Sequence, residues 1–217
     1  MTARVAALFD MDKTLLRVDT ATSWSRFLYA RGELSTRMLA KATYWSLLYK
    51  LAVLDMETVF SRLVADLEGD SEAEMIETST AWFRDHIAPA IAPAARVAAW
   101  HHQQAGEVLV LATGSTQYAA RPVAAACGID HVLSSVLEVR EGRFTGHARP
   151  CFGHHKVAMV ERWATEHEVD LARSTFYSDS FNDLPLLARV GTPIAVNPDA
   201  RLRRHALRHG WPIQIWH

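Results

Sequence analysis

Two aspartates separated by a single residue follow a short apolar run near the start of the chain. The run is Val5–Phe9, and the aspartates are Asp10 and Asp12. Such a run is typical of a buried strand, and open α/β sheets bind ligands just past the carboxyl ends of their strands. Because neighbouring carboxylates repel each other, the pair needs a cation or a shared proton. Their hard oxygen atoms suit Mg²⁺, which favours one or two carboxylates together with phosphate oxygens.

Three further polar groups occur in or beside predicted turns. Thr113-Gly114-Ser115 follows the run VLVLA and opens a predicted helix, Lys156 stands near the start of another helix, and Asp179, Asn182 and Asp183 follow TFYS. Singly these signals are weak, because a Thr-Gly-Ser turn is usually a helix cap and a lone lysine is usually on the surface. Together, in this order, they predict one site.

The predicted chemistry is phosphoryl transfer. Asp10 is placed to attack phosphorus and form an aspartyl-phosphate. Mg²⁺, Lys156 and the hydroxyl and N–H groups of Thr113–Ser115 can neutralise the phosphoryl oxygens. Asp12 can protonate the departing alkoxide and then deprotonate the incoming water. Asp179 is expected to complete a metal site with the Asp10 carboxylate and the Asp12 backbone carbonyl.

Two more residues are expected to support this site by holding its catalytic and metal-binding residues, without contacting the substrate themselves. Thr14 stands close after the aspartate pair. Asp183 is expected to orient Lys156 or a metal-bound water.

The combination of motifs resembles the haloacid dehalogenase (HAD) superfamily of phosphatases, most closely its phosphoserine-phosphatase-like branch, subfamily IB. The motifs are FDMDKT, LATGS, the isolated Lys156 and YSDSFND, and they extend from Leu8 to Asp183. The resemblance implies an α/β fold: a Rossmann-like parallel sheet with a helical cap of the C1 type inserted after the first strand. It also implies Mg²⁺ dependence and an aspartyl-phosphate intermediate.

The resemblance also assigns roles to individual residues. Asp10 matches the nucleophile, Asp12 the acid/base, Ser115 or Thr113 the phosphate contact, Lys156 the phosphate lysine and Asp179 the metal ligand. Three positions depart from the related phosphoserine enzymes: Lys13 stands where serine is common, Thr113 where serine is usual, and Ser178 where glycine is frequent. None of these departures removes a catalytic group.

Three residues are candidates for contact with the rest of the substrate. An acidic residue nine positions after the nucleophile contacts the substrate in the related branch, and Asp19 stands at that position here; it either recognises an ammonium group or caps a helix. Arg62 could reach a substrate carboxylate or phosphate, or form a surface salt bridge. Asn182 could contact the substrate or start a helix.

The periodicity divides the chain into strands, helices and a helical insertion. Strands are predicted at Val5–Phe9, Glu107–Ala112, Ser174–Ser178 and Thr192–Val196, and helices at Thr116–Cys127, His155–His167 and Asp199–Arg208. A hairpin is predicted from Val136–Val139 and Arg143–His147 around a Gly turn. The insertion is predicted to contain helices at Thr22–Ala30, Ser35–Leu54, Met56–Leu67 and Ser71–His86. We therefore expect a catalytic core of residues 1–16 and 89–217, and a cap of residues 17–88.

Composition excludes several other functions. The formal net charge of −1 gives no basic field for nucleic acid. The two cysteines fit reduced thiols in a cytoplasm, and a strand this near the start leaves no room for a signal peptide. The eleven histidines show no pair spaced with cysteine or glutamate ligands, so no zinc site is predicted. The aromatic segment Met38–Leu54 is short for a membrane span and is expected to be a cap helix.

These features predict a Mg²⁺-dependent phosphomonoesterase acting on a small phosphorylated metabolite. An amino-alcohol phosphate such as phosphoserine or histidinol phosphate is the preferred substrate class. Asp12 favours phosphatase over dehalogenase activity, because a halide leaves without a proton whereas an alkoxide benefits from an acid. Two alternatives remain: a lipid-phosphate phosphatase docked on a membrane by Met38–Leu54, and a non-catalytic phosphate-binding module. The sequence does not predict the oligomeric state.

Overall fold

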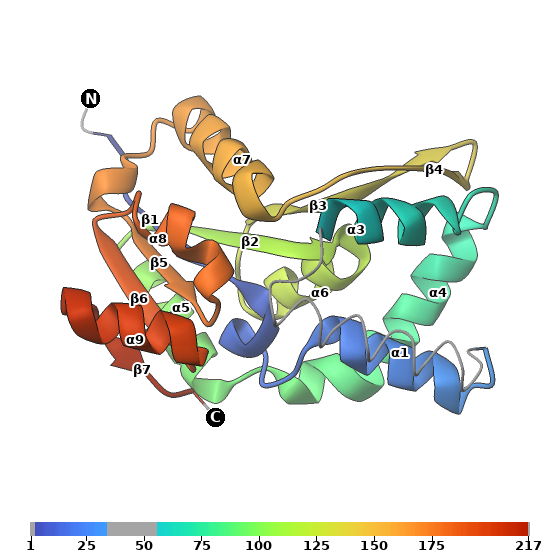
Figure 1. The fold of residues 1–217 in the computed structure, drawn as a ribbon, viewed down its shortest axis with the longest axis horizontal. Coiled ribbons are helices and arrows are strands. Elements are labelled where there is room, and N and C mark those ends of the chain that lie inside the picture. Colours follow the sequence, from blue (N-terminus) through green and yellow to red (C-terminus); the bar gives the residue numbers. More distant parts are fainter. Residues whose placement is uncertain (1–2, 34–55, 217) are drawn as a thin grey trace.

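A seven-stranded sheet forms the centre of the molecule (Figure 1). The structure, a computed structural model, describes residues 3–33 and 56–216. The strands lie in the order β4-β3-β2-β1-β5-β6-β7, and all neighbours are parallel except β3 and β4. They are β1 (Ala6–Phe9), β2 (Val108–Thr116), β3 (His131–Arg140), β4 (Arg143–Arg149), β5 (Thr175–Ser178), β6 (Thr192–Val196) and β7 (Ile213–Gln214). The predicted parallel α/β sheet is confirmed.

Helices cover both faces of this sheet, as a parallel sheet requires. Those of the core are α5 (Pro93–Gln104), α6 (Gln117–Ala126), α7 (Gly153–Glu166), α8 (Leu184–Leu187) and α9 (Ala200–His209). Ala7 and Phe9 of β1 pack in one apolar cluster with α5 and α6, whereas Ala6 and Leu8 pack in another with α7, α8 and α9. The apolar run Val5–Phe9 is therefore buried on both faces.

The sheet register brings three strand ends to one edge. Phe9 of β1 pairs with Leu111 of β2 and with Tyr177 of β5. Since these strands are parallel, the residues that follow Phe9 and Tyr177 emerge beside each other and beside the last residues of β2. This edge carries the predicted catalytic groups.

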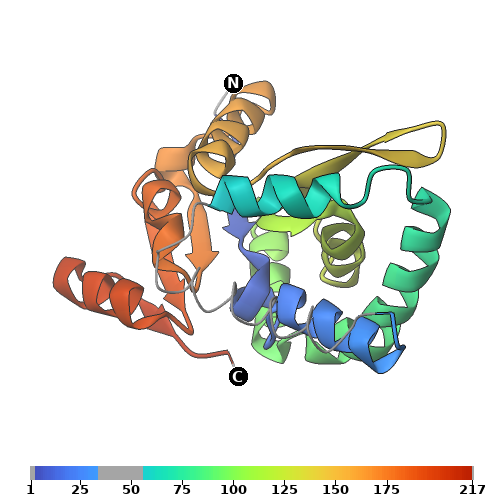
Figure 2. The ribbon, with the colours of Figure 1, turned by 45° about the vertical axis from the view of Figure 1, so that its right-hand side comes forward.

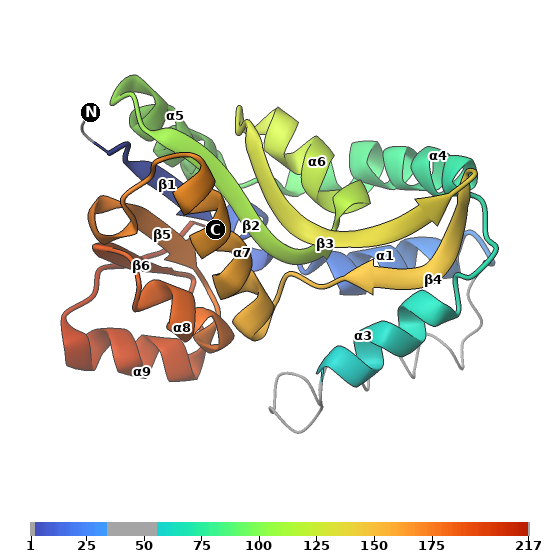
Figure 3. The same cartoon turned by 90° about the horizontal axis from the view of Figure 1, so that it is seen from above.

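Helices α1 (Thr20–Ala30), α3 (Met56–Ala65) and α4 (Glu72–Trp82) form the insertion after β1 and lie to one side of the core (Figures 1 and 3). They confirm three of the four predicted helices, although α4 ends at Trp82 and a π-helical turn, Phe83–Ile87, continues the predicted run to His86. The fourth, Ser35–Leu54, and the aromatic segment Met38–Leu54 lie outside the described residues. The domain boundaries at residues 16/17 and 88/89 stay a prediction.

The predicted hairpin is present and reaches into the insertion, where α3 lies alongside it (Figures 2 and 3). Backbone hydrogen bonds join its strand β4 to the turn between α3 and α4. Gly69 N donates to Phe144 O over 2.9 Å, and Phe144 N donates to Asp70 O over 3.0 Å. Val64 and Leu137 pack with Phe144 in a buried cluster beneath this contact. The carboxyl end of α3 is thus anchored to the hairpin.

Within the two described ranges, no helix combines the length and the apolar character that crossing a bilayer requires.

Candidate active site

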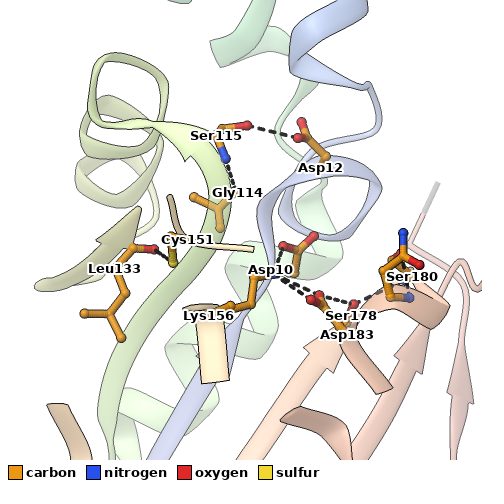
Figure 4. A network of polar contacts seen from close by, with 12 residues as sticks. Asp10, Asp12, Gly114, Ser115, Leu133, Cys151, Lys156, Ser178, Ser180 and Asp183 are labelled. Atoms are coloured by element: carbon orange, nitrogen blue, oxygen red, sulfur yellow. Dashed lines mark hydrogen bonds and ion pairs between the residues drawn. The ribbon is translucent and has the colours of Figure 1, made fainter. Parts of the chain in front are cut away.

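A buried ammonium group joins two carboxylates at the edge where the strands end. Lys156 Nζ lies 2.9 Å from Asp10 Oδ1 and 2.8 Å from Asp183 Oδ1 (Figure 4). Asp10 directly follows β1, Asp183 ends a 3₁₀ turn after β5, and Lys156 lies in the first turn of α7. All three residues are at most 7% exposed. The structure therefore brings together residues that the sequence places 146 positions apart.

The charge of Lys156 is stabilised by its two partners. Burial alone lowers the pKa of a lysine, but the carboxylates of Asp10 and Asp183 outweigh burial and raise the pKa of Lys156. The Asp183 carboxylate is itself held by Ser178, whose Oγ donates to Asp183 Oδ2 over 2.8 Å. Lys156 is therefore a fixed cation beside the Asp10 carboxylate.

Asp12 lies two residues after Asp10 in the same turn and accepts hydrogen bonds from two residues. Thr20 donates to it from the backbone N over 2.7 Å and from Oγ1 over 3.0 Å. Ser115 Oγ donates to Asp12 Oδ2 over 3.1 Å (Figure 4). Burial, followed by the nearby Asp19 carboxylate, raises the pKa of Asp12 to about 6, although the bonds from Thr20 oppose this shift. An acid with this pKa can both give and take a proton near neutral pH.

A tight turn after β1 positions the two aspartates. Lys13 has a left-handed backbone with φ of 55°, which is uncommon for a residue other than glycine. Asn197 Nδ2 donates to Lys13 O over 2.8 Å, and Leu16 N donates to Met11 O over 2.9 Å. Backbone strain of this kind is concentrated at functional sites, where surrounding contacts hold it.

Asp179 directly follows β5 and is half-buried. Its pKa is raised to about 8, first by burial and then by the Asp10 carboxylate, while the Lys13 ammonium acts in the opposite direction. Asp179 therefore belongs to the same electrostatic cluster as Asp10. Asp199 N donates to Asp179 O over 2.8 Å and fixes the backbone at this point.

Thr113-Gly114-Ser115 differs from the prediction in its local structure. We expected a turn that opens a helix, but β2 continues through Thr116, and its pairing with β3 is irregular between Ala112 and Thr116. Here Ser115 N donates to Thr113 Oγ1 over 3.2 Å, and Gly114 O accepts from Ser135 Oγ over 2.7 Å. The segment nevertheless lies at the same sheet edge, and Ser115 reaches Asp12.

Thr14 is fully buried after the aspartate pair. Among the described residues, its Oγ1 is a buried side-chain oxygen without a hydrogen-bond partner. A buried hydroxyl in this state costs about 1–3 kcal/mol.

The three predicted substrate residues differ in their surroundings. Asp19 Oδ1 accepts from Thr22 N over 2.8 Å and so caps α1, yet its charge also acts on Asp12. Arg62 is exposed on α3, and Asn182 is exposed in the 3₁₀ turn after β5. No side-chain hydrogen bond or ion pair within residues 3–33 and 56–216 joins either of them to the Asp10 cluster.

Three residues that support the site were given no role from the sequence: Thr20, Ser178 and Asn197. Thr20 holds the Asp12 carboxylate, Ser178 holds Asp183, and Asn197 holds the turn at Lys13. Each is an ordinary polar residue beside a turn, so only its contacts reveal its role. Asn197 follows the predicted strand Thr192–Val196, which is the one signal that could have placed it at this edge.

The donor set fits a divalent cation. In the described part of the chain, carboxylates outnumber ammonium groups at this edge: Asp10, Asp12, Asp179 and Asp183 against Lys13 and Lys156. Burial, followed by the charges of Asp183 and Asp12, raises the pKa of Asp10 to about 7 despite Lys156. A hard cation would offset this excess of negative charge. The carboxylates of Asp10 and Asp179 and the carbonyl of Asp12 are the candidate ligands.

Comparison with known proteins defines the family. The model of haloacid dehalogenase-like hydrolases matches residues 7–188, so the chain belongs to this family and is a HAD-type phosphatase. It is 31% identical to a histidinol-phosphatase of Neisseria meningitidis over 214 residues, covering 95% of this chain and 96% of the relative. It is 34% identical to a phosphoserine phosphatase of Mycobacterium tuberculosis over 215 residues, covering 96% and 70%.

A solved structure shares the fold. A protein of unknown function from Bordetella pertussis superposes with a TM-score of 0.87 at 33% identity, covering 98% of this chain and 99% of the other. The predicted family and the predicted fold class are therefore confirmed.

Proposed function

We propose that this protein is a Mg²⁺-dependent phosphomonoesterase that hydrolyses a small phosphorylated metabolite through an aspartyl-phosphate on Asp10. The observation that carries this proposal is the 2.9 Å contact between Lys156 Nζ and Asp10 Oδ1 in a buried site. A carboxylate can attack a phosphate ester only where the charge on the phosphoryl oxygens is neutralised. The fixed ammonium of Lys156 stands beside the attacking oxygen.

In the first step, an Asp10 carboxylate oxygen forms a bond to phosphorus. The bond between phosphorus and the ester oxygen breaks, and Asp12 gives its proton to the departing alkoxide. Thr20 and Ser115 keep the Asp12 carboxyl group oriented for this transfer. Lys156 and the polar groups of Thr113–Ser115 contact the phosphoryl oxygens.

In the second step, Asp12 is ionised and takes a proton from water. The water oxygen bonds to phosphorus, the bond between phosphorus and the Asp10 oxygen breaks, and inorganic phosphate leaves. Asp12 is then protonated again, as the first step requires. A pKa of about 6 suits this alternation.

Asp10, Asp179 and the backbone carbonyl of Asp12 would hold Mg²⁺. When bound, the ion supplies positive charge to the phosphoryl oxygens and to the buried carboxylates. Asp183 positions Lys156, and Ser178 positions Asp183.

We further propose an amino-alcohol phosphate as the substrate. Asp19 supports this class. Its carboxylate is close enough to Asp12 to raise the pKa of Asp12. The negative charge of Asp19 therefore lies near the acid that protonates the leaving group, where it could bind an ammonium group. The names of the two relatives, histidinol-phosphatase and phosphoserine phosphatase, point to the same class. Arg62 and Asn182 are further candidates for contact with the leaving group, for example with a carboxylate at Arg62.

The test is phosphate release by purified protein over a panel of metabolite phosphates, with and without Mg²⁺. We expect turnover of histidinol phosphate or phosphoserine, loss of turnover in excess chelator and recovery when Mg²⁺ is restored. Asp10→Asn is the matched control, because it is nearly isosteric and removes the nucleophile. Turnover of sugar phosphates alone would refute the substrate class, and near wild-type turnover by Asp10→Asn would refute the covalent route.

A further inference from the structure

Two consecutive histidines of the core face a glutamate from the helical insertion. His155 Nε2 lies 3.1 Å from Glu57 Oε1, and His154 Nδ1 lies 3.7 Å from the same oxygen. The two imidazole rings lie side by side, with centroids 3.9 Å apart. In the part of the chain that the structure describes, these ligand atoms all lie within 4.8 Å of one another.

The two separations from Glu57 Oε1 are close to those between neighbouring ligands of a transition metal, and the shorter one is also a hydrogen bond between Glu57 and His155. Zinc binds histidine nitrogen and carboxylate oxygen at about 2.0–2.2 Å, so neighbouring ligands of a tetrahedral ion lie about 3.4 Å apart. The distances from Glu57 Oε1 to the two histidine nitrogens, 3.1 and 3.7 Å, lie on either side of that value. We propose that Glu57, His154 and His155 form a second metal site, specific for a divalent transition ion such as Zn²⁺.

The ligand types separate this site from the magnesium site. Imidazole suits zinc, copper and nickel, whereas magnesium favours oxygen ligands alone. The side chains of Glu57, His154 and His155 are 49%, 75% and 38% exposed, so an ion reaches them from solvent. Glu57 also lines a groove of about 170 Å³ that includes His147, which places a further imidazole on the same surface.

The proposed metal site lies at the end of α3 opposite to the end that is anchored to the hairpin. Glu57 lies in the first turn of α3, whereas the carboxyl end of α3 leads into the turn anchored to the hairpin by Gly69 and Phe144. A helix of this length spans about 15 Å, so the metal site and the anchor hold opposite ends of α3. Between them, the Phe60 ring packs edge-on against Phe152, with centroids 5.4 Å apart.

An ion at this site therefore fastens the insertion to the catalytic core. His155 directly precedes Lys156 in the first turn of α7. A bound ion would tie α3 to the turn that carries the buried ammonium group and would add its binding free energy to the folded state. Sequence spacing gives no sign of this site, because Glu57 is 98 positions from His155.

The test is zinc affinity measured by competition with a chromophoric chelator, in saturating Mg²⁺. We expect one equivalent of Zn²⁺ to bind the wild-type protein. Glu57→Gln and His155→Asn should each weaken binding at least about tenfold, since even the loss of a residue that only orients a ligand costs about that much. Asp10→Asn and His101→Asn, which alter the active site and an exposed histidine on α5, should retain wild-type affinity.

Cobalt substitution gives an independent readout. Co²⁺ in a tetrahedral nitrogen and oxygen environment has a stronger visible absorption than octahedral Co²⁺, and His155→Asn should abolish it. Melting temperatures measured without metal show whether each variant is folded. Zinc affinity that survives Glu57→Gln and His155→Asn but falls in Asp10→Asn would overturn the proposal. Because none of these readouts requires turnover, its failure is distinct from failure of the proposed phosphatase function.

Discussion

Ser115, on β2, and Asp12, in the turn after β1, meet through a hydrogen bond of 3.1 Å between Ser115 Oγ and Asp12 Oδ2. Ser115 also lies 2.8 Å from Thr20 Oγ1, so one hydroxyl links the segment after β1 to β2. From the sequence, either Ser115 or Thr113 was expected to contact phosphate. Its position beside Asp12 adds a second role, that of orienting the acid/base.

The first prediction separates these two roles of Ser115. In Ser115→Ala, Asp12 keeps its two bonds from Thr20 but loses one restraint. We expect kcat to fall about tenfold to a hundredfold, as for loss of an orienting partner, with little change in the affinity for inorganic phosphate. Steady-state kinetics and phosphate inhibition measure the two effects. Thr113→Ala is the comparison variant: Thr113 is the other candidate phosphate contact, so its loss should weaken phosphate inhibition rather than disturb Asp12. A rise in the inhibition constant of phosphate without loss of kcat would assign Ser115 to phosphate binding alone.

The second prediction concerns the buried pair of Lys156 and Asp183. Lys156→Met leaves both Asp10 and Asp183 without their shared cation, so we expect the free energy of unfolding to fall by about 3–5 kcal/mol. Adding Asp183→Asn removes one of the two unpaired carboxylates and should restore part of this loss. Urea denaturation of the single and double variants measures the coupling. Additive effects of the two substitutions would show that the pair is not coupled.

The third prediction uses the buried hydroxyl of Thr14, which has no partner among the described residues. Thr14→Val keeps the shape of the side chain and removes the unsatisfied oxygen. We expect the free energy of unfolding to rise by about 1 kcal/mol, which corresponds to a melting temperature about 2–4 °C higher. Thr22→Val, at a less buried position on α1, is the control. A loss of stability in Thr14→Val would mean that the hydroxyl is hydrogen-bonded in solution.

The fourth prediction concerns the reactivity of the two thiols. Burial raises the pKa of Cys127 and of Cys151 to about 11. The thiolate is the reactive form, and a thiol with this pKa is about one-thousandth ionised at pH 8. We expect the native protein to react with an aromatic disulfide reagent more than about a hundredfold slower than free cysteine. If one equivalent of reagent reacts rapidly with the native protein, the thiol that reacts is not buried.

The sequence predicted well which residues meet at one edge of the sheet, because the signals there are local. The apolar run before Asp10 indicated a buried strand, and a parallel sheet necessarily gathers strand ends at one edge. The helix that carries Lys156 was also expected, and α7 begins only two residues before the predicted start. Fold class and family followed from this short set of motifs.

The parts that the sequence did not predict depend on contacts between distant residues. The contact of Asn197 with Lys13 spans 184 positions, and the Glu57 carboxylate meets His155 only because the fold brings the first turn of α3 to the first turn of α7. The continuation of β2 through Thr116 was missed because a Thr-Gly-Ser segment favours a turn locally, whereas pairing with β3 overrides that preference.

The last prediction tests whether Asp19 is more than a helix cap. Asn caps a helix about as well as Asp, so Asp19→Asn should keep the bond from Thr22 N while removing the negative charge beside Asp12. We expect the free energy of unfolding to change little and the KM for an amino-alcohol phosphate to rise at least about tenfold, as for loss of a charge-assisted hydrogen bond. The KM for a phosphate ester without an amino group should stay the same.

Asp19→Ala supplies the contrast for this experiment. Loss of the cap should cost about 1 kcal/mol of stability, and it removes the charge as well, so its KM for the amino-alcohol phosphate should match that of Asp19→Asn. If Asp19→Asn instead keeps wild-type KM for every substrate while Asp19→Ala is destabilised, Asp19 is a cap alone. The ammonium group of the substrate would then have to be recognised elsewhere, or the substrate would carry none.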